Sequence, residues 1–319
     1  MSKGDLLARW SAQPEGPESR PRYLVRKALR HAYWARTEGL GRLVEEDRLD
    51  PRDRVRIAWA KAAWRRRQGG RAGAAVPVYV VGLQRSGTNM LMRGLDEAPE
   101  VEVRNENDRT VFDRFRLRSD EVLAATVAAS RHQVVLVKPL CESHRVDELL
   151  DLPGVRHGRA LWVYRDPESR ARSEVSKFGS ANLKALREIA AGRGAAIWQG
   201  GRLGPEAVEL ISSFDLEAMT PHTAAVLFWV VRNGLVFDLG LDRRDDVHLV
   251  SYDAFAADPE PVMREICAVI GFPYRDELCA HVERRQSHGS APLDIDPRVR
   301  ELAADLTDRL DQARAGQSR

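Results

Sequence analysis

The stretch VPVYVVGLQRSGTNMLMRGL, residues 76–95, constrains the fold more than any other part of the sequence. It begins with an apolar run that predicts a buried strand and ends in a pattern that predicts an amphipathic helix. A glycine-containing turn joins the two. Where a strand turns directly into a helix, several backbone N–H groups and the positive end of the helix dipole converge on one place. The turn therefore predicts an anion-binding site.

The residues of this turn differ from those of a loop that binds nucleoside triphosphates. Gly82 and Gly87 have the spacing of such a loop, but Thr88-Asn89 stands where Lys-Ser/Thr is needed. That lysine bridges the terminal phosphates, and the hydroxyl beside it ligates magnesium. Here Arg85 offers a bidentate cation, and the hydroxyls on either side of Gly87 add donors. We expect a metal-free anion, although the turn alone is equally consistent with a structural helix cap.

Four short apolar runs predict strands: VPVYVVG (76–82), VVLVKP (134–139), RALWVYR (159–165) and DVHLVSY (246–252). Their near-continuous apolarity is typical of strands buried on both faces of a parallel sheet. Helical patterns stand between them, and the apolar stretch 223–237 predicts a buried helix because it is too short and too interrupted to span a bilayer. The sequence thus predicts a three-layer α/β/α fold with a central parallel sheet.

Three regions are expected along the chain: a flexible N-terminus over 1–22, a basic helical extension over 23–75, and the main domain over 76–319. The extension contains predicted helices at 23–47 and 52–68, and residues 1–75 carry 18 Lys/Arg against 9 Asp/Glu. Such helices can contact a membrane surface, but a solvated pair packed on the main domain is the favoured interpretation. The excess of arginine over lysine indicates a GC-rich, bacterial genome, and no nucleic-acid partner is expected.

A second candidate anion site follows the third predicted strand. RALWVYR ends in Arg165-Asp166-Pro167, and Ser173 lies two turns along the helix that follows. In open α/β sheets, ligands bind at the carboxyl ends of the strands, which is where Arg165 stands. Arg165 and Ser173 can therefore reach one anionic group. The alternative for the arginine alone is an ion pair with Asp166 or another neighbour.

Taken together, GLQRSGTNMLMRGLDEAPEV and VYRDPESRARS resemble two motifs of the 3′-phosphoadenosine 5′-phosphosulfate (PAPS) sulfotransferases. A third stretch, VSYDAFAADPEPVMREICAVIGFP (250–273), resembles the late strand and helix of that family. The resemblance covers residues 76 to about 273, and it implies the P-loop NTPase-like sulfotransferase fold. Two motifs in the right order are far more specific than either motif alone.

The resemblance implies a role for each matching residue. The 5′-phosphosulfate would be held by Arg85, Ser86, Gly87, Thr88 and Asn89, and the 3′-phosphate by Arg165 and Ser173. The basic stretch ERRQSHGS, which contains Arg285, would close over the 3′-phosphate, although the family's glycine-rich form of this motif is missing. Asn89 also departs from the family, which more often has threonine there. No metal is implied.

The catalytic base is expected among the residues that follow the first motif. The histidine of the cytosolic branch would fall on Leu140, so that pattern fails, and the tyrosine-protein sulfotransferase branch is the better match. That branch implies Glu106 as the general base and Lys138, with Arg85, as the cation that stabilises the leaving group. Glu106 can instead be a surface carboxylate paired with an arginine. Glu142 and His144 are the runner-up bases.

The expected activity is sulfuryl transfer from PAPS to a hydroxyl of a small molecule, sugar or lipid. A nucleotide-dependent kinase and a catalytically inactive nucleotide-binding relative stay open as alternatives. The glycine-rich segment 192–204 is expected to form a mobile loop or lid near the acceptor. The three cysteines show no metal-ligand spacing, and with no apolar signal-peptide core at the start they predict a cytoplasmic protein with reduced core thiols.

Overall fold

The computed structural model describes residues 51–113, 115–284 and 292–317, with residues 21, 25, 28 and 29 before them. By its internal contacts the chain divides into residues 1–63 and 64–319, and the sheet lies in the second unit. Helix α4, Pro51–Gln68, runs across this division. The helix predicted over 52–68 therefore exists and ends just before Gly69-Gly70, whereas nearly all of the helix predicted over 23–47 lies outside the described residues.

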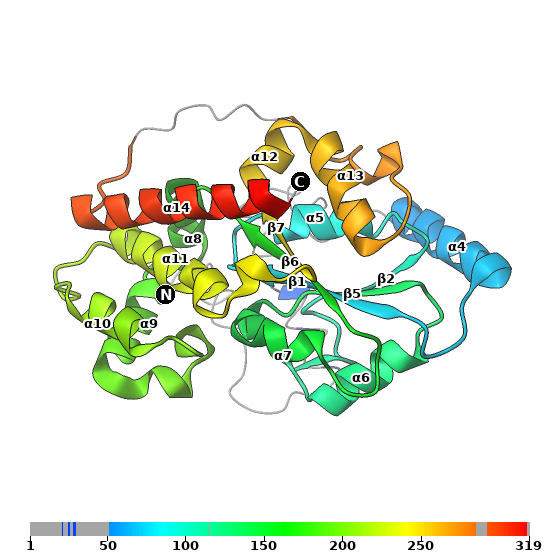
Figure 1. Cartoon of the computed structure of the whole chain (residues 1–319), viewed down its shortest axis with the longest axis horizontal. Coiled ribbons are helices and arrows are strands. Elements are labelled where there is room, and N and C mark those ends of the chain that lie inside the picture. Colours follow the sequence, from blue (N-terminus) through cyan, green and yellow to red (C-terminus); the bar gives the residue numbers. More distant parts are fainter. Residues whose placement is uncertain are drawn as a thin grey trace. The chain divides into compact units, whose positions relative to one another are not determined.

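A five-stranded, fully parallel sheet forms the centre of the second unit (Figure 1). Its strand order is β2-β5-β1-β6-β7, with bounds Val101–Arg104, Val134–Val137, Val76–Gly82, Arg159–Tyr164 and Val247–Ser251. The four predicted strands and the α/β class are confirmed. The edge strand β2 was not predicted, because VEVR is short and places a charged residue at every second position.

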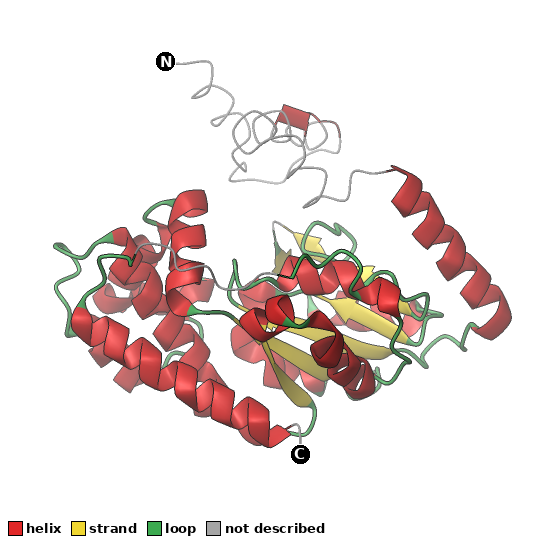
Figure 2. Cartoon of the chain, turned by 90° about the horizontal axis from the view of Figure 1, so that it is seen from above, coloured by secondary structure: helices red, strands yellow, loops and turns green. Residues whose placement is uncertain are grey.

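Helices cover both faces of this sheet, as Figures 1 and 2 show. Alternate strand residues such as Val78 and Val80 pack with three helices on one face: α5 (Thr88–Leu95), α12 (Tyr252–Ala257) and α13 (Pro259–Ile270). Tyr79 and Val81 face the second cluster, which includes α6 (Asp120–Ala129), α7 (Val146–Leu150), α8 (Pro167–Phe178), α9 (Ala181–Glu188), α11 (Pro221–Asp238) and α14 (Pro297–Gln317). The predicted three layers are present.

Helix α11 is the predicted buried helix, and its residues are buried nearly all the way round. No helix within the described ranges is both long and apolar enough to cross a membrane. Cys141, Cys267 and Cys279 are buried and form no disulfide.

The glycine-rich segment 192–204 is not one open loop. It begins inside a helical turn, Ile189–Arg193, and continues through two 3-10 turns, Gly194–Ala196 and Trp198–Gly200, toward α10 (Pro205–Ser212). Trp198 and Leu203 pack against the larger core cluster. The structure thus gives this segment a packed side, and its role as a lid stays a prediction.

Candidate functional site

The side chains of the candidate site gather at one edge of the sheet because all five strands are parallel and end there. One residue of the candidate site lies just past the end of each strand. Across the sheet in strand order these residues are Glu106 after β2, Lys138 after β5, Arg85 after β1, Arg165 after β6 and Tyr252 after β7. The site therefore extends over the whole width of the edge.

The turn between β1 and α5 has the backbone geometry of an anion cradle. Arg85 and Gly87 both have left-handed φ angles, 69° and 88°. Among the described residues, the N–H groups of Gly87, Thr88 and Asn89 donate no hydrogen bond, as expected for the first turn of a helix. In the same turn, Ser86 Oγ is buried and has no hydrogen-bond partner among the described residues. These unpartnered donors fit a bound anion better than a structural cap.

Two hydrogen bonds connect the two predicted anion sites. Arg85 Nε donates to Ser173 Oγ over 2.9 Å, and Arg165 Nη1 donates to the carbonyl oxygen of Arg85 over 3.3 Å. The Oδ1 atom of Asp166 accepts the Ser169 N–H and thereby caps α8. Arg165 therefore contacts the backbone of the first loop, and its charge also acts on the neighbouring Asp253.

Glu106 and Lys138 form an ion pair at the neighbouring strand ends. Lys138 Nζ lies 3.0 Å from Glu106 Oε2 and donates to Asn89 Oδ1 over 2.6 Å. The two charged side chains are only 7% and 15% exposed, so solvent screens their interaction little. Arg104 pairs with Glu102 and with Asp108 rather than serving Glu106. Asn89 therefore connects the anion loop to the proposed catalytic pair.

The two runner-up bases differ in their surroundings. Glu142 is buried and forms an ion pair with Arg116, and burial raises the pKa of its carboxyl despite that arginine. Burial, with Arg232 and Arg116 nearby, lowers the pKa of His144 to about 4. His144 is therefore neutral near pH 7 and a weak proton acceptor there.

A buried polar network that the sequence did not single out lies beneath the anion loop. Arg170 of α8 is fully buried and donates to the carbonyl oxygen of Gln84 over 3.1 Å. The same guanidinium donates to Asn182 Oδ1 over 2.7 Å and lies 3.3 Å from Glu174 Oε2. Burial lowers the pKa of Arg170 to about 10 and raises that of Glu174, which is typical of a charge pair removed from water.

Tyr252 was not among the predicted site residues either, because it stands in the predicted last strand and carries no charge. The basic stretch predicted to close over the 3′-phosphate includes Arg285, which lies outside the described residues. Its neighbour Arg284 pairs with Asp258 and Glu260.

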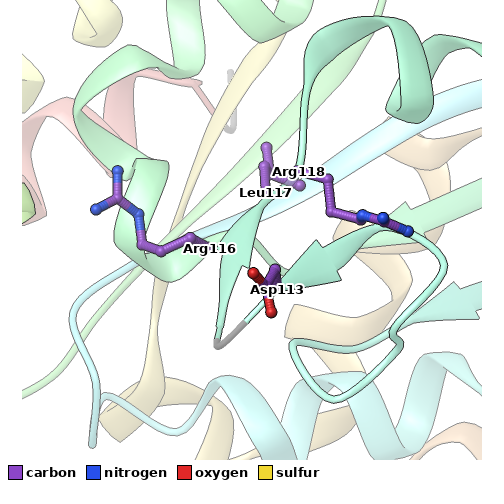
Figure 3. A pocket seen from close by; sticks show the side chains of 4 residues that line it. All are labelled: Asp113, Arg116, Leu117 and Arg118. Carbon is purple, nitrogen blue, oxygen red and sulfur yellow. The ribbon is translucent and has the colours of Figure 1, made fainter. Parts of the chain in front are cut away.

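A shallow cavity of about 420 Å³ lies beside a small hairpin, β3 (Phe112–Asp113) and β4 (Arg116–Leu117). Its lining residues are Asp113, Arg116, Leu117 and Arg118 (Figure 3). Arg118 also donates to the carbonyl oxygen of Arg109, on the turn that carries Glu106. One lining residue of the cavity thus contacts the turn that carries the proposed base.

No protein-family model matches the chain, and no curated protein matches it. Several solved structures are similar to it, and three of them are sulfotransferases or sulfotransferase domains. The sulfotransferase from Alicyclobacillus acidocaldarius is 17% identical, with a TM-score of 0.42, covering 77% of this chain and all of that one. The sulfotransferase domain of the Synechococcus PCC 7002 olefin synthase is 12% identical (TM-score 0.41; 75% and 98% covered). The sulfotransferase domain of the curacin biosynthetic pathway is 11% identical (0.39; 73% and 98%).

Proposed function

We propose that this chain is a sulfotransferase that uses PAPS as its donor substrate and sulfates a hydroxyl group. One observation carries the proposal: the hydrogen bond from Arg85 to Ser173 joins two cationic sites at the carboxyl edge of the sheet. One site is a helix N-terminus with unpartnered donors, and the other is centred on Arg165. A ligand with anionic groups at two separate positions matches that arrangement, and a 5′,3′-bisphosphorylated nucleotide is such a ligand.

The residues of the loop support PAPS rather than a nucleoside triphosphate as the donor. Lys138 approaches the loop from β5 and binds Asn89, so a cation is present, but it is paired with Glu106 rather than placed within the loop. The positions that would supply the bridging lysine and the magnesium ligand are Thr88 and Asn89. A phosphosulfate needs charge stabilisation at its bridging oxygen, for which a lysine at the strand end is suited.

The donor supplies an activated sulfuryl group, and the residues of the chain supply the proton acceptor and the charge. Glu106 takes the proton from the acceptor hydroxyl as the oxygen–sulfur bond forms. The bond between the sulfur and the bridging oxygen breaks, and the bisphosphate leaves with the electron pair. Lys138 and Arg85 balance the charge that develops on the leaving group. We place the acceptor, a small molecule, sugar or lipid, on the Glu106 side of the edge.

The test is donor consumption that depends on an acceptor. Purified protein is incubated with PAPS labelled in the sulfate, with and without a set of hydroxyl compounds, without added metal. We expect at least one compound to accelerate release of 3′-phosphoadenosine 5′-phosphate and to carry the label, and we expect Glu106→Gln to abolish both. If the label is transferred equally well by Glu106→Gln, the assigned base is wrong. Phosphate transfer from Mg-ATP in place of sulfate transfer would make the protein a kinase.

A further inference from the structure

Tyr252 occupies the boundary between the two anion sites. It follows the last residue of β7 and is the first residue of α12, and Ser251 Oγ accepts the Ala254 N–H to cap that helix. A strand end and a helix start therefore both fix its backbone. Its side chain is half-buried, and neither the sequence motifs nor the proposed chemistry assigns it a role.

On one side, the tyrosine ring packs directly against the anion loop. A Cβ atom built on Gly87 would lie 1.9 Å from Tyr252 Cδ2, which no side chain can accommodate. Gly87 also has a left-handed φ of 88°. The loop backbone thus approaches the ring as closely as a residue without a side chain allows.

The face of the same ring supports the second anion site, which is centred on Arg165. Arg165 Cζ lies 4.6 Å from the centre of the Tyr252 ring, within the range of a cation–π interaction. Next to it, Asp253 Oδ2 accepts the Asp166 N–H over 2.6 Å and ties the two strand ends together. Arg165 Nη1 donates to the carbonyl oxygen of Arg85, whereas Arg165 Nε is buried and donates no hydrogen bond to the described residues, so the ring face adds to the support of this guanidinium.

We propose that Tyr252 is a positioning residue that sets the separation between the two anion sites. A planar ring with two side-chain torsions holds Gly87 and Arg165 at a fixed spacing with little loss of conformational entropy. This spacing would select a nucleotide that carries phosphates at both the 5′ and 3′ positions over one with a 5′-phosphate alone. The inference rests on the proposed function, because it assigns the donor's two anionic groups to these two sites.

The test is the ratio of two dissociation constants measured by calorimetry, that of 5′-AMP divided by that of 3′-phosphoadenosine 5′-phosphate. Tyr252→Leu keeps much of the bulk beside Gly87 but removes the ring face under Arg165. We expect Tyr252→Leu to lower this ratio about tenfold. Tyr252→Phe, which keeps the ring, should have the wild-type ratio. Tyr274→Leu is the matched control, because Arg264 stacks on that ring at 3.9 Å in another part of the second unit.

A double-mutant cycle separates positioning from general support of the fold. In an Arg165→Met background, Tyr252→Leu should no longer change the ratio. If Tyr252→Leu weakens both nucleotides equally, Tyr252 is merely structural and the inference is overturned. The same holds if the ratio is unchanged, and Tyr252→Met serves as the second variant should the leucine variant not fold. A wild-type protein that binds neither nucleotide would instead refute the proposed function itself.

Discussion

Lys138 Nζ and Glu106 Oε2 lie 3.0 Å apart, just past the ends of the neighbouring strands β5 and β2. The pair holds the proposed proton acceptor and the proposed leaving-group cation at one point before any substrate is bound. In the proposed mechanism the two members of this pair have complementary roles: Glu106 accepts the proton, and Lys138 stabilises the leaving group.

Replacing Glu106 tests this assignment most simply. Glu106→Gln keeps the size of the side chain but removes the proton acceptor, and we expect kcat to fall at least about 100-fold. Binding of 3′-phosphoadenosine 5′-phosphate should change little. Glu102→Gln is the matched control, since Glu102 pairs with Arg104 on the same strand end. Equal losses in both variants would point to damage of this segment rather than to lost catalysis.

Asn89 is expected to act through Lys138. Asn89→Ala removes the acceptor of the 2.6 Å hydrogen bond from Lys138 Nζ and frees the ammonium to turn away. Because hydrogen bonds to charged groups contribute about 1.5–3 kcal/mol, kcat should fall roughly 10- to 100-fold. Steady-state kinetics with saturating PAPS checks this. A rise in the KM for PAPS with unchanged kcat would assign Asn89 to donor binding alone.

Gly87 is expected to tolerate no side chain. Gly87→Ala places a methyl group into the Tyr252 ring and strains a left-handed backbone, so the loop must move. Affinity for 3′-phosphoadenosine 5′-phosphate should fall more than about tenfold, a loss that calorimetry can follow. Gly154→Ala is the control, because Gly154 has a similar φ of 82° with nothing within 4 Å. If the two variants bind equally well, the ring does not constrain the loop.

The network below the loop should contribute mainly to stability. Arg170→Met leaves Glu174 buried without its cation, and breaking such a pair typically costs about 3–5 kcal/mol. The free energy of unfolding in urea should fall by about that amount. The double variant Arg170→Met/Glu174→Gln should recover part of it, because the uncompensated charge is gone. Failure of the second change to recover any stability would mean that the lost contacts to Gln84 and Asn182 dominate.

His144 gives the fold a pH dependence of known sign. Its pKa is about 4 in the folded protein and near 6.5 when the chain unfolds. Between these values the unfolded chain binds a proton that the folded chain does not, so acid favours unfolding. The His144 contribution is complete above about pH 6.5 and is lost progressively toward pH 4. Urea midpoints at pH 5.5 and 7.5 should differ less in His144→Gln than in the wild type; an equal difference would contradict the assignment.

The layers and most strands could be predicted from the sequence because buried parallel strands leave near-continuous apolar runs such as VVLV. Strand β2 could not, because its VEVR pattern is that of an edge strand. The positions of the two candidate anion motifs at strand ends could be predicted because each motif directly follows an apolar run. The contacts of Arg170 with Gln84 and of Tyr252 with Arg165 could not, since each joins residues more than 80 positions apart in the sequence.

Only the three-dimensional structure gives a physical reason for the asparagine at position 89. The sequence shows an asparagine where the resembling family more often has threonine. The structure shows that its side-chain oxygen accepts a hydrogen bond from Lys138, 49 positions further along the chain. No pattern within the loop itself could indicate that partner.

Calorimetric titration with 3′-phosphoadenosine 5′-phosphate, 5′-AMP and Mg-ATP tests the central claim most directly. The account predicts tight binding of the bisphosphate, much weaker binding of 5′-AMP, and loss of that difference in Arg165→Ala. Binding of Mg-ATP in preference to the bisphosphate, or equal binding of the bisphosphate and 5′-AMP by the wild-type protein, would contradict it.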